Sequence, residues 1–191
     1  MKRIWYGLAM IFAAGLAALA GKAFSQQDKY SLQVPNGLAF AEFRGYEDWQ
    51  TIAVSQTGAT NVLRVILGNP LMMKACREGI PGNGKPFPDG AKMAKIVWKQ
   101  KAITTAPFSV STPDTVADTL EDVEFMEKDS KRFADSGGWG WAVFEYDAAS
   151  GTFRPGTTAD KPPQGNDAKC GLACHTIAKP RDYVFTAYAN R

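Results

Sequence analysis

The sequence is poor in histidine and cysteine, two side chains that often bind metals in proteins. It has one histidine, His175, and three cysteines among 191 residues. A structural zinc site usually takes four Cys or His ligands, so two cysteines beside this histidine do not complete one. Three cysteines also leave one thiol over when two form a disulfide in an oxidising compartment. A metal held by two histidines of this chain is excluded.

The chain lacks a surplus of charge in the part that is expected to fold. Its formal net charge is +3. Lys2, Arg3 and Lys22 supply three positive charges in a stretch without acidic residues, so the charge of residues 26–191 is balanced. Because no excess of basic side chains remains to neutralise phosphates, the composition argues against nucleic acid as a partner.

The first 25 residues have the pattern of a secretory signal peptide. Lys2 and Arg3 precede an apolar run over residues 4–20, and the small residues Ala23 and Ser25 follow it. This pattern predicts export to the periplasm, with cleavage before Gln26 and no membrane contact afterwards. A retained membrane anchor is the alternative, because the run is just long enough to span a bilayer when tilted.

No internal repeat or low-complexity segment stands out in the rest of the chain. Hydrophobic residues make up 45% and charged residues 21% of the sequence, which is typical of a globular protein. We therefore expect one domain over residues 26–191.

The hydrophobic pattern predicts an α+β fold in which an antiparallel β-sheet dominates. Helical spacing begins at Tyr46 and includes Trp49, Ile52 and Ala53, and a short helix with Asn69 as its N-cap runs from Pro70 to Gly79. Residues 103–117 are expected to be a loop. Strands are expected over residues 60–67, 91–99, 123–128 and 139–146. Residues 147–154 are expected to form a hairpin turn and a short return strand.

One short segment carries the chemistry: Cys170-Gly171-Leu172-Ala173-Cys174-His175. Two thiols followed directly by a histidine are typical of haem attachment, in which the thiols bond to the porphyrin and His175 binds the iron. Three residues separate the cysteines here, whereas the usual spacing is two. A Cys170–Cys174 disulfide remains the alternative from these residues alone.

Segments from Phe43 onward resemble the cytochrome P460 family of small exported haem proteins. The similarity lies in the haem segment and in the stretches at residues 44–49, 87–90, 94–95, 128–134, 138–141, 178–179 and 182–186. The resemblance implies a mostly antiparallel β fold, a homodimer and one covalent haem c. It further implies that His175 is the proximal ligand and that the opposite side of the iron is open.

The resemblance also implies an activity and a special lysine. Members of the family oxidise hydroxylamine and carry a lysine bonded to the porphyrin edge, and Lys95 matches that lysine. Relatives named cytochrome c′-beta lack this bond and bind nitric oxide. From its neighbours alone, Lys95 either lies on an inward strand face with Met93 and Val97 or is an ordinary solvated lysine.

Three functions therefore stay open: oxidation of hydroxylamine or a related small nitrogen compound, binding of nitric oxide, and electron transfer to a soluble redox partner. Glu145 is a weak candidate for the base that oxidation requires. Cys76 is expected to be a small buried hydrophobe. Electron transfer would be favoured by a sixth ligand from among the methionines Met72, Met73, Met93 and Met126.

Overall fold

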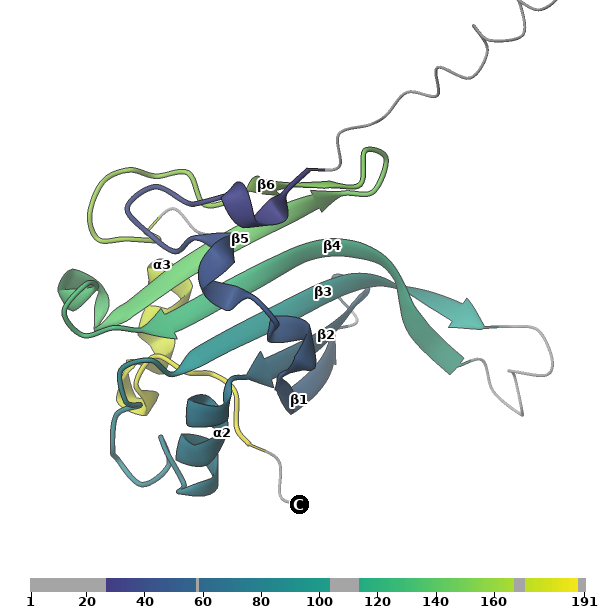
Figure 1. Ribbon diagram of the computed structural model, residues 1–191. Coiled ribbons are helices and arrows are strands. Elements are labelled where there is room, and N and C mark those ends of the chain that lie inside the picture. The colour runs from purple at the N-terminus through teal and green to yellow at the C-terminus, as the bar shows by residue number, and fades with distance from the viewer. Residues whose placement is uncertain (1–26, 58, 104–113, 167–170, 189–191) are drawn as a thin grey trace, which may run out of the picture.

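The computed structural model describes residues 27–57, 59–103, 114–166 and 171–188. Its centre is a six-stranded antiparallel sheet in which each strand pairs with the next in sequence (Figure 1). The strands are β1 (Gln50–Thr57), β2 (Val62–Gly68), β3 (Lys92–Ile103), β4 (Asp114–Lys128), β5 (Trp139–Asp147) and β6 (Thr152–Pro155). The expected α+β fold with a dominant antiparallel sheet is confirmed.

Short helices connect and flank the strands. They are η2 (Lys29–Ser31), η3 (Phe40–Phe43), η4 (Tyr46–Asp48), α2 (Pro70–Arg77), η5 (Ala134–Ser136), α3 (Leu172–His175) and η6 (Thr176–Arg181). The predicted cap of α2 is confirmed, because the Asn69 side chain accepts a hydrogen bond of 2.9 Å from the amide of Met72. The signal segment, residues 1–25, lies outside the described residues.

The helical expectation after Tyr46 is wrong. Only η4 is helical there, and Trp49 already has an extended backbone with φ −73° and ψ 159°. Strand β1 then places Ile52 in the core, with 1% of its surface exposed, while Val54 is 74% exposed. Pairing with β2 satisfies the backbone of this segment, so tertiary contacts override a weak local preference for helix.

The expectation of a loop over residues 103–117 is also wrong for those of its residues that the structure describes. Strand β3 continues to Ile103 and β4 begins at Asp114, and these two residues are paired in the antiparallel register. Residues 104–113 lie outside the described part. The paired ends of β3 and β4 therefore extend beyond β2, whose last pair with β3 is Val62 with Lys99.

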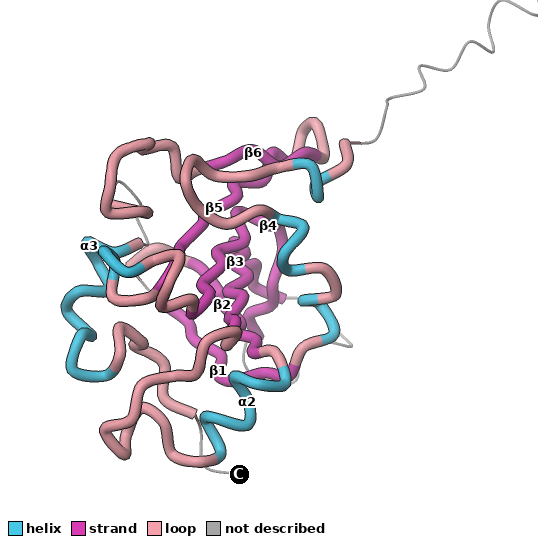
Figure 2. Tube along the Cα trace, turned by 60° about the vertical axis from the view of Figure 1, so that its left-hand side comes forward, coloured by secondary structure: helices cyan, strands magenta, loops and turns pink. Residues whose placement is uncertain are grey.

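The two faces of the sheet are covered by different segments of the chain (Figure 2). Residues 28–49 cover one face and form with it the N-terminal core, whose buried members include Phe40, Phe43, Phe125 and Phe144. Helix α2 and the C-terminal segment cover part of the other face. There they form the C-terminal core with Met72, Met73, Met93, Met126, Trp139, Trp141 and Val184.

Among the residues that the structure describes, no helix has the length and apolar character needed to cross a membrane.

Candidate functional site

Helix α3 carries the second half of the motif. Gly171 precedes this single turn, and its carbonyl accepts a hydrogen bond of 3.0 Å from the His175 amide. Cys174 is exposed, whereas His175 is partly buried. The short turn therefore carries an exposed thiol and a partly buried imidazole on consecutive residues. Cys170 lies outside the described residues.

The ring of His175 is held in one orientation. Its Nδ1 lies 2.6 Å from the carbonyl oxygen of Tyr183. A carbonyl only accepts hydrogen bonds, so Nδ1 carries the proton and Nε2 keeps its lone pair. Burial lowers the pKa of His175, which keeps the imidazole neutral, and the positive charge of Lys95 acts in the same direction. A neutral imidazole with a fixed tautomer is suited to bind a metal through Nε2.

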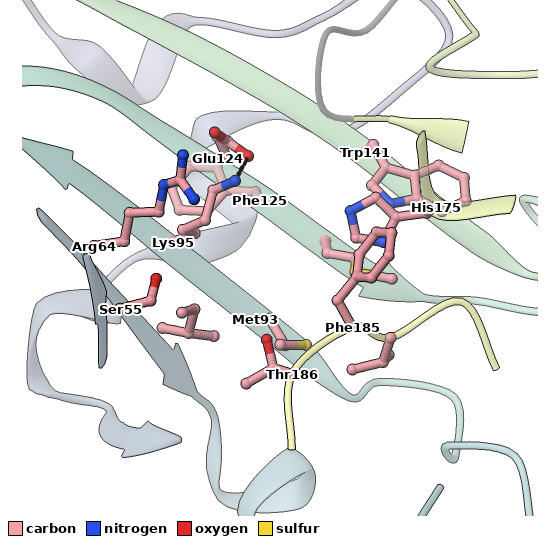
Figure 3. Close-up of a pocket in the computed structure, with 13 residues that line it drawn as sticks. Ser55, Arg64, Met93, Lys95, Glu124, Phe125, Trp141, His175, Phe185 and Thr186 are labelled. Carbon is pink, nitrogen blue, oxygen red and sulfur yellow. Dashed lines mark ion pairs between the residues drawn. The ribbon is translucent and has the colours of Figure 1, made fainter. Parts of the chain in front are cut away.

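A cavity of about 270 Å³ lies beside this ring. Strands β1–β5 and the C-terminal segment form its walls (Figure 3). Around His175 the wall is apolar: the rings of Trp141 and Phe185 lie 5.8 Å and 5.0 Å from the imidazole between centroids. The lining residues are Ser55, Arg64, Ile66, Met93, Lys95, Glu124, Phe125, Met126, Trp141, His175, Val184, Phe185 and Thr186.

The strand side of the cavity is charged. Lys95 on β3 and Glu124 on β4 are paired in register, and Lys95 Nζ forms an ion pair with Glu124 Oε2. Their side chains are 25% and 12% exposed, so both are largely removed from water. Arg64 on β2 joins them, and Figure 3 shows these three side chains grouped apart from His175 and Trp141. The structure thus brings Lys95 and His175 to one cavity.

Sequence reasoning missed Arg64 and Glu124. Both carry a detectable signal, because side chains two residues apart on a strand share a face. Arg64 is two residues from Ile66, and Glu124 is two residues from Met126, and all four line the cavity. Without the register of the sheet, however, the sequence does not show that these faces look toward His175.

Glu145 lies elsewhere. Its carboxylate forms an ion pair of 2.7 Å with Arg154 on the paired strand β6, and its side chain is 35% exposed. It lines a second hollow, together with Lys99, Glu121 and Asp122, and does not line the cavity beside His175. Among the carboxylates that sequence and structure single out, Glu124 is the one in that cavity.

The four methionines divide into two pairs. Met72 and Met73 on α2 have no exposed surface and pack in the C-terminal core. Met93 and Met126, each 6% exposed, belong to the same core but also line the cavity. Cys76 is 8% exposed in this core, and burial raises the pKa of its thiol, in agreement with its predicted role as a small hydrophobe.

The residues present fit a haem. The cavity offers a neutral imidazole with an available Nε2 and the apolar walls that a porphyrin face requires, and the residue before this histidine, Cys174, has an exposed thiol. The indole Nε1 of Trp141, beside His175, is buried and has no hydrogen-bond partner among the described residues. Buried donors are normally satisfied, so an acceptor from a bound group would complete this site.

A comparison with known families agrees with this geometry. The family model described as Cytochrome P460 matches residues 43–186, from the end of η3 to beyond the His175 turn. A search of the curated proteins found no match. The match spans all six strands of the sheet and the segment that holds His175, and the chain therefore belongs to the cytochrome P460 family of haem proteins.

Proposed function

We propose that this protein is a periplasmic cytochrome that oxidises hydroxylamine or a related small nitrogen compound. One haem c is attached through Cys170 and Cys174, and His175 is its proximal ligand. The observation that carries the proposal is the shared cavity. A neutral imidazole and a group of charged side chains, Lys95, Glu124 and Arg64, line the same space. A bound haem would supply the redox-active iron.

The charged wall suits proton-coupled oxidation better than simple ligand binding. Removing electrons from hydroxylamine also releases protons, so the reaction needs a nearby acceptor. Glu124 is 12% exposed and is held against Lys95, which gives its carboxylate a fixed position in the cavity. We assign Glu124 the role of proton acceptor. Arg64 belongs to the same group of charged side chains on the cavity wall.

Lys95 is the residue that we propose to be bonded to the porphyrin edge. It lies on the wall of the cavity and its side chain is 25% exposed, whereas the side chain of Lys99 on the same strand is 64% exposed. Glu124 is the ionic partner of the Lys95 amine at the cavity wall. This placement favours the inward alternative for Lys95 over the solvated one.

The decisive experiment is the absorption spectrum of the purified ferrous protein, combined with mass spectrometry of the haem peptide. A red-shifted Soret band and a peptide that links Lys95 to haem are expected. A five-coordinate spectrum without the link would instead favour a nitric oxide binder. Protein without covalent haem would contradict the whole proposal.

Substitution of Lys95 tests the same point. Lys95→Ala should return the Soret band to the position of an ordinary haem c, because the link is lost. The matched control is Lys99→Ala, on the same strand but outside the cavity, which should leave the spectrum unchanged. An unchanged spectrum in Lys95→Ala would show that Lys95 has no bond to the porphyrin.

One observation favours a second function. Met93 and Met126 line the cavity, and a methionine bound to the iron would make an electron carrier. A six-coordinate low-spin spectrum would support that alternative. In either case we propose that the protein is a homodimer and exchanges electrons with a soluble redox partner.

A further inference from the structure

A buried ion pair lies behind the His175 turn, away from the charged wall of the cavity. Lys128, at the end of β4, and Asp182, just after η6, are joined by a distance of 2.7 Å between Nζ and Oδ1. Their side chains are only 8% and 12% exposed. Lys128 Nζ also donates to the carbonyl of Gly137, at 3.0 Å. The pair therefore connects the sheet to the segment that follows the haem motif.

Asp182 uses both carboxylate oxygens. While Oδ1 binds Lys128, Oδ2 accepts a hydrogen bond of 2.8 Å from the amide of Phe87, in the loop before β3. One side chain thus joins three separate parts of the chain. Buried ion pairs are often replaceable by apolar residues without loss of stability, so stability alone does not account for this arrangement.

The backbone at Asp182 is unusual. Asp182 and Tyr183 are consecutive non-glycine residues with positive φ, 50° and 62°. Most residues avoid this left-handed region, and surrounding contacts must offset its free-energy cost. The carbonyl of Tyr183 then lies 2.6 Å from His175 Nδ1. The strained turn and the hydrogen bond to the imidazole therefore belong to one structural unit.

The ring of Tyr183 fixes this unit from the other side. It packs directly on Gly137, where a Cβ atom would collide with the ring, and Gly137 has φ +73°. The same glycine provides the carbonyl that binds Lys128. The loop between β4 and β5 thus holds both the ring of Tyr183 and the cation that binds the carboxylate of its neighbour, Asp182.

We propose that Lys128 and Asp182 are positioning residues for the axial histidine, which rests on the assignment of His175 as the iron ligand under the proposed function. They hold the Tyr183 carbonyl against Nδ1–H. A strong hydrogen bond at Nδ1 makes an imidazole a better electron donor through Nε2. The ion pair therefore sets how strongly His175 stabilises the ferric iron, although neither residue lies in the cavity.

The test replaces Lys128 by methionine in the haem-loaded protein. Lys128→Met leaves the Asp182 carboxylate without its cation, so the Tyr183 turn should loosen. The weaker hydrogen bond should lower the iron–histidine stretching frequency in the ferrous resonance Raman spectrum and raise the reduction potential. Both readouts report on the ligand itself and do not depend on catalytic turnover.

The matched control is Lys92→Met. Lys92 forms a similar ion pair with Glu127, of 3.1 Å with side chains 20% and 13% exposed. It lies on the opposite face, where its amine lies 5.0 Å from the Phe43 ring centre in the N-terminal core. This variant loses a comparable pair, yet it should leave the stretching frequency and the potential as in the wild type.

A second variant covers the case in which Lys128→Met does not fold. Lys128→Met combined with Asp182→Leu removes both charges, so no buried charge is left without a partner. The double variant also frees the Tyr183 turn. It should therefore lower the iron–histidine stretching frequency and raise the reduction potential, as Lys128→Met does. Unchanged readouts in a wild-type-like histidine-ligated haem would overturn the inference. A wild-type protein without an iron–histidine band would overturn the proposed function itself.

Discussion

The residue that most alters the interpretation of this site is Glu124. The sequence offered Glu145 as a base, yet Glu145 pairs with Arg154 at a second hollow, while Glu124 lies in the cavity with Lys95. Strand periodicity alone does not distinguish the two carboxylates, because they lie on paired strands of the same sheet. Only the position of the His175 segment decides which of them shares a cavity with this histidine.

Glu124→Gln should remove the proposed proton acceptor and keep the shape of the side chain. We expect the rate of hydroxylamine-dependent reduction of an electron acceptor to fall by about 10²–10⁴-fold, with haem content unchanged. The control is Glu121→Gln on the same strand, whose carboxylate pairs with Lys99 outside the cavity. Full activity in Glu124→Gln would show that the proton goes elsewhere.

Asp122 provides a pH-dependent prediction. Burial, followed by the negative charge of Glu124, raises its pKa from 3.8 to about 7. Folded protein therefore keeps a proton that the unfolded chain has lost, so stability falls as the pH rises between these two values. Asp122→Asn has no proton to lose, and its Tm relative to wild type should increase between about pH 5 and about pH 8.

The control for this measurement is Asp118→Asn. Asp118 is on the same strand, with a side chain that is 46% exposed. Its Tm relative to wild type should be the same at both pH values. A pH-independent difference for Asp122→Asn as well would contradict the raised pKa of Asp122.

At the scale of elements, the sequence was informative where local chemistry determines structure. Asn69 before Pro70 predicted the start of α2, and the aromatic run from Trp139 predicted β5 within one residue of its observed end. It failed at β1 and at the first part of β4. There the pairing partner, and not local propensity, makes the strand.

The same limit applies to the site. The motif predicted Cys170, Cys174 and His175 as haem-binding residues, and the family resemblance pointed to Lys95. Arg64 and Glu124 were not predicted, because three strands must first align in register before these side chains meet. The Lys128–Asp182 pair spans 54 residues of sequence and leaves no local signal.

Asn69 also allows a prediction at this scale. Its side chain accepts from the amides of Met72 and Lys92 and donates to the carbonyl of Gly90, so it joins α2 to the start of β3. Loss of a helix N-cap costs about 1 kcal/mol, with about 2 kcal/mol at the upper end, and we expect Asn69→Ala to lie near that upper end.

Chemical denaturation measures this effect. The control is Gln56→Ala, which removes an exposed hydrogen bond to Gln100 and should change the free energy of unfolding by less than about 0.5 kcal/mol. Equal effects of the two variants would show that Asn69 does not link α2 to the sheet.

For the whole molecule, the important feature is the separation of two cores by one sheet. The cavity beside His175 lies on one face, whereas residues 28–49 pack on the other. Phe40 is fully buried there, although it precedes the matched range of the family model. Its ring contacts those of Tyr30, Tyr46, Phe125, Phe144 and Phe153.

Phe40→Ala should therefore lower stability without altering the haem. Truncation of a buried phenylalanine costs about 3–5 kcal/mol, and thermal unfolding should detect it. The absorption spectrum at a temperature where the variant is folded should match that of the wild type. A changed Soret band would mean that the two faces are coupled through the sheet.

The order of the strands has a consequence for how the molecule forms. Every strand pairs with its sequence neighbour, so the sheet can assemble through contacts that are local in sequence, which form faster than contacts between distant segments. The segment that holds His175 closes onto this sheet from far along the chain, since Asp182 meets Phe87 across 95 residues. We therefore expect the strands that carry Arg64, Lys95 and Glu124 to pair first. The segment with His175 should dock onto them late in folding.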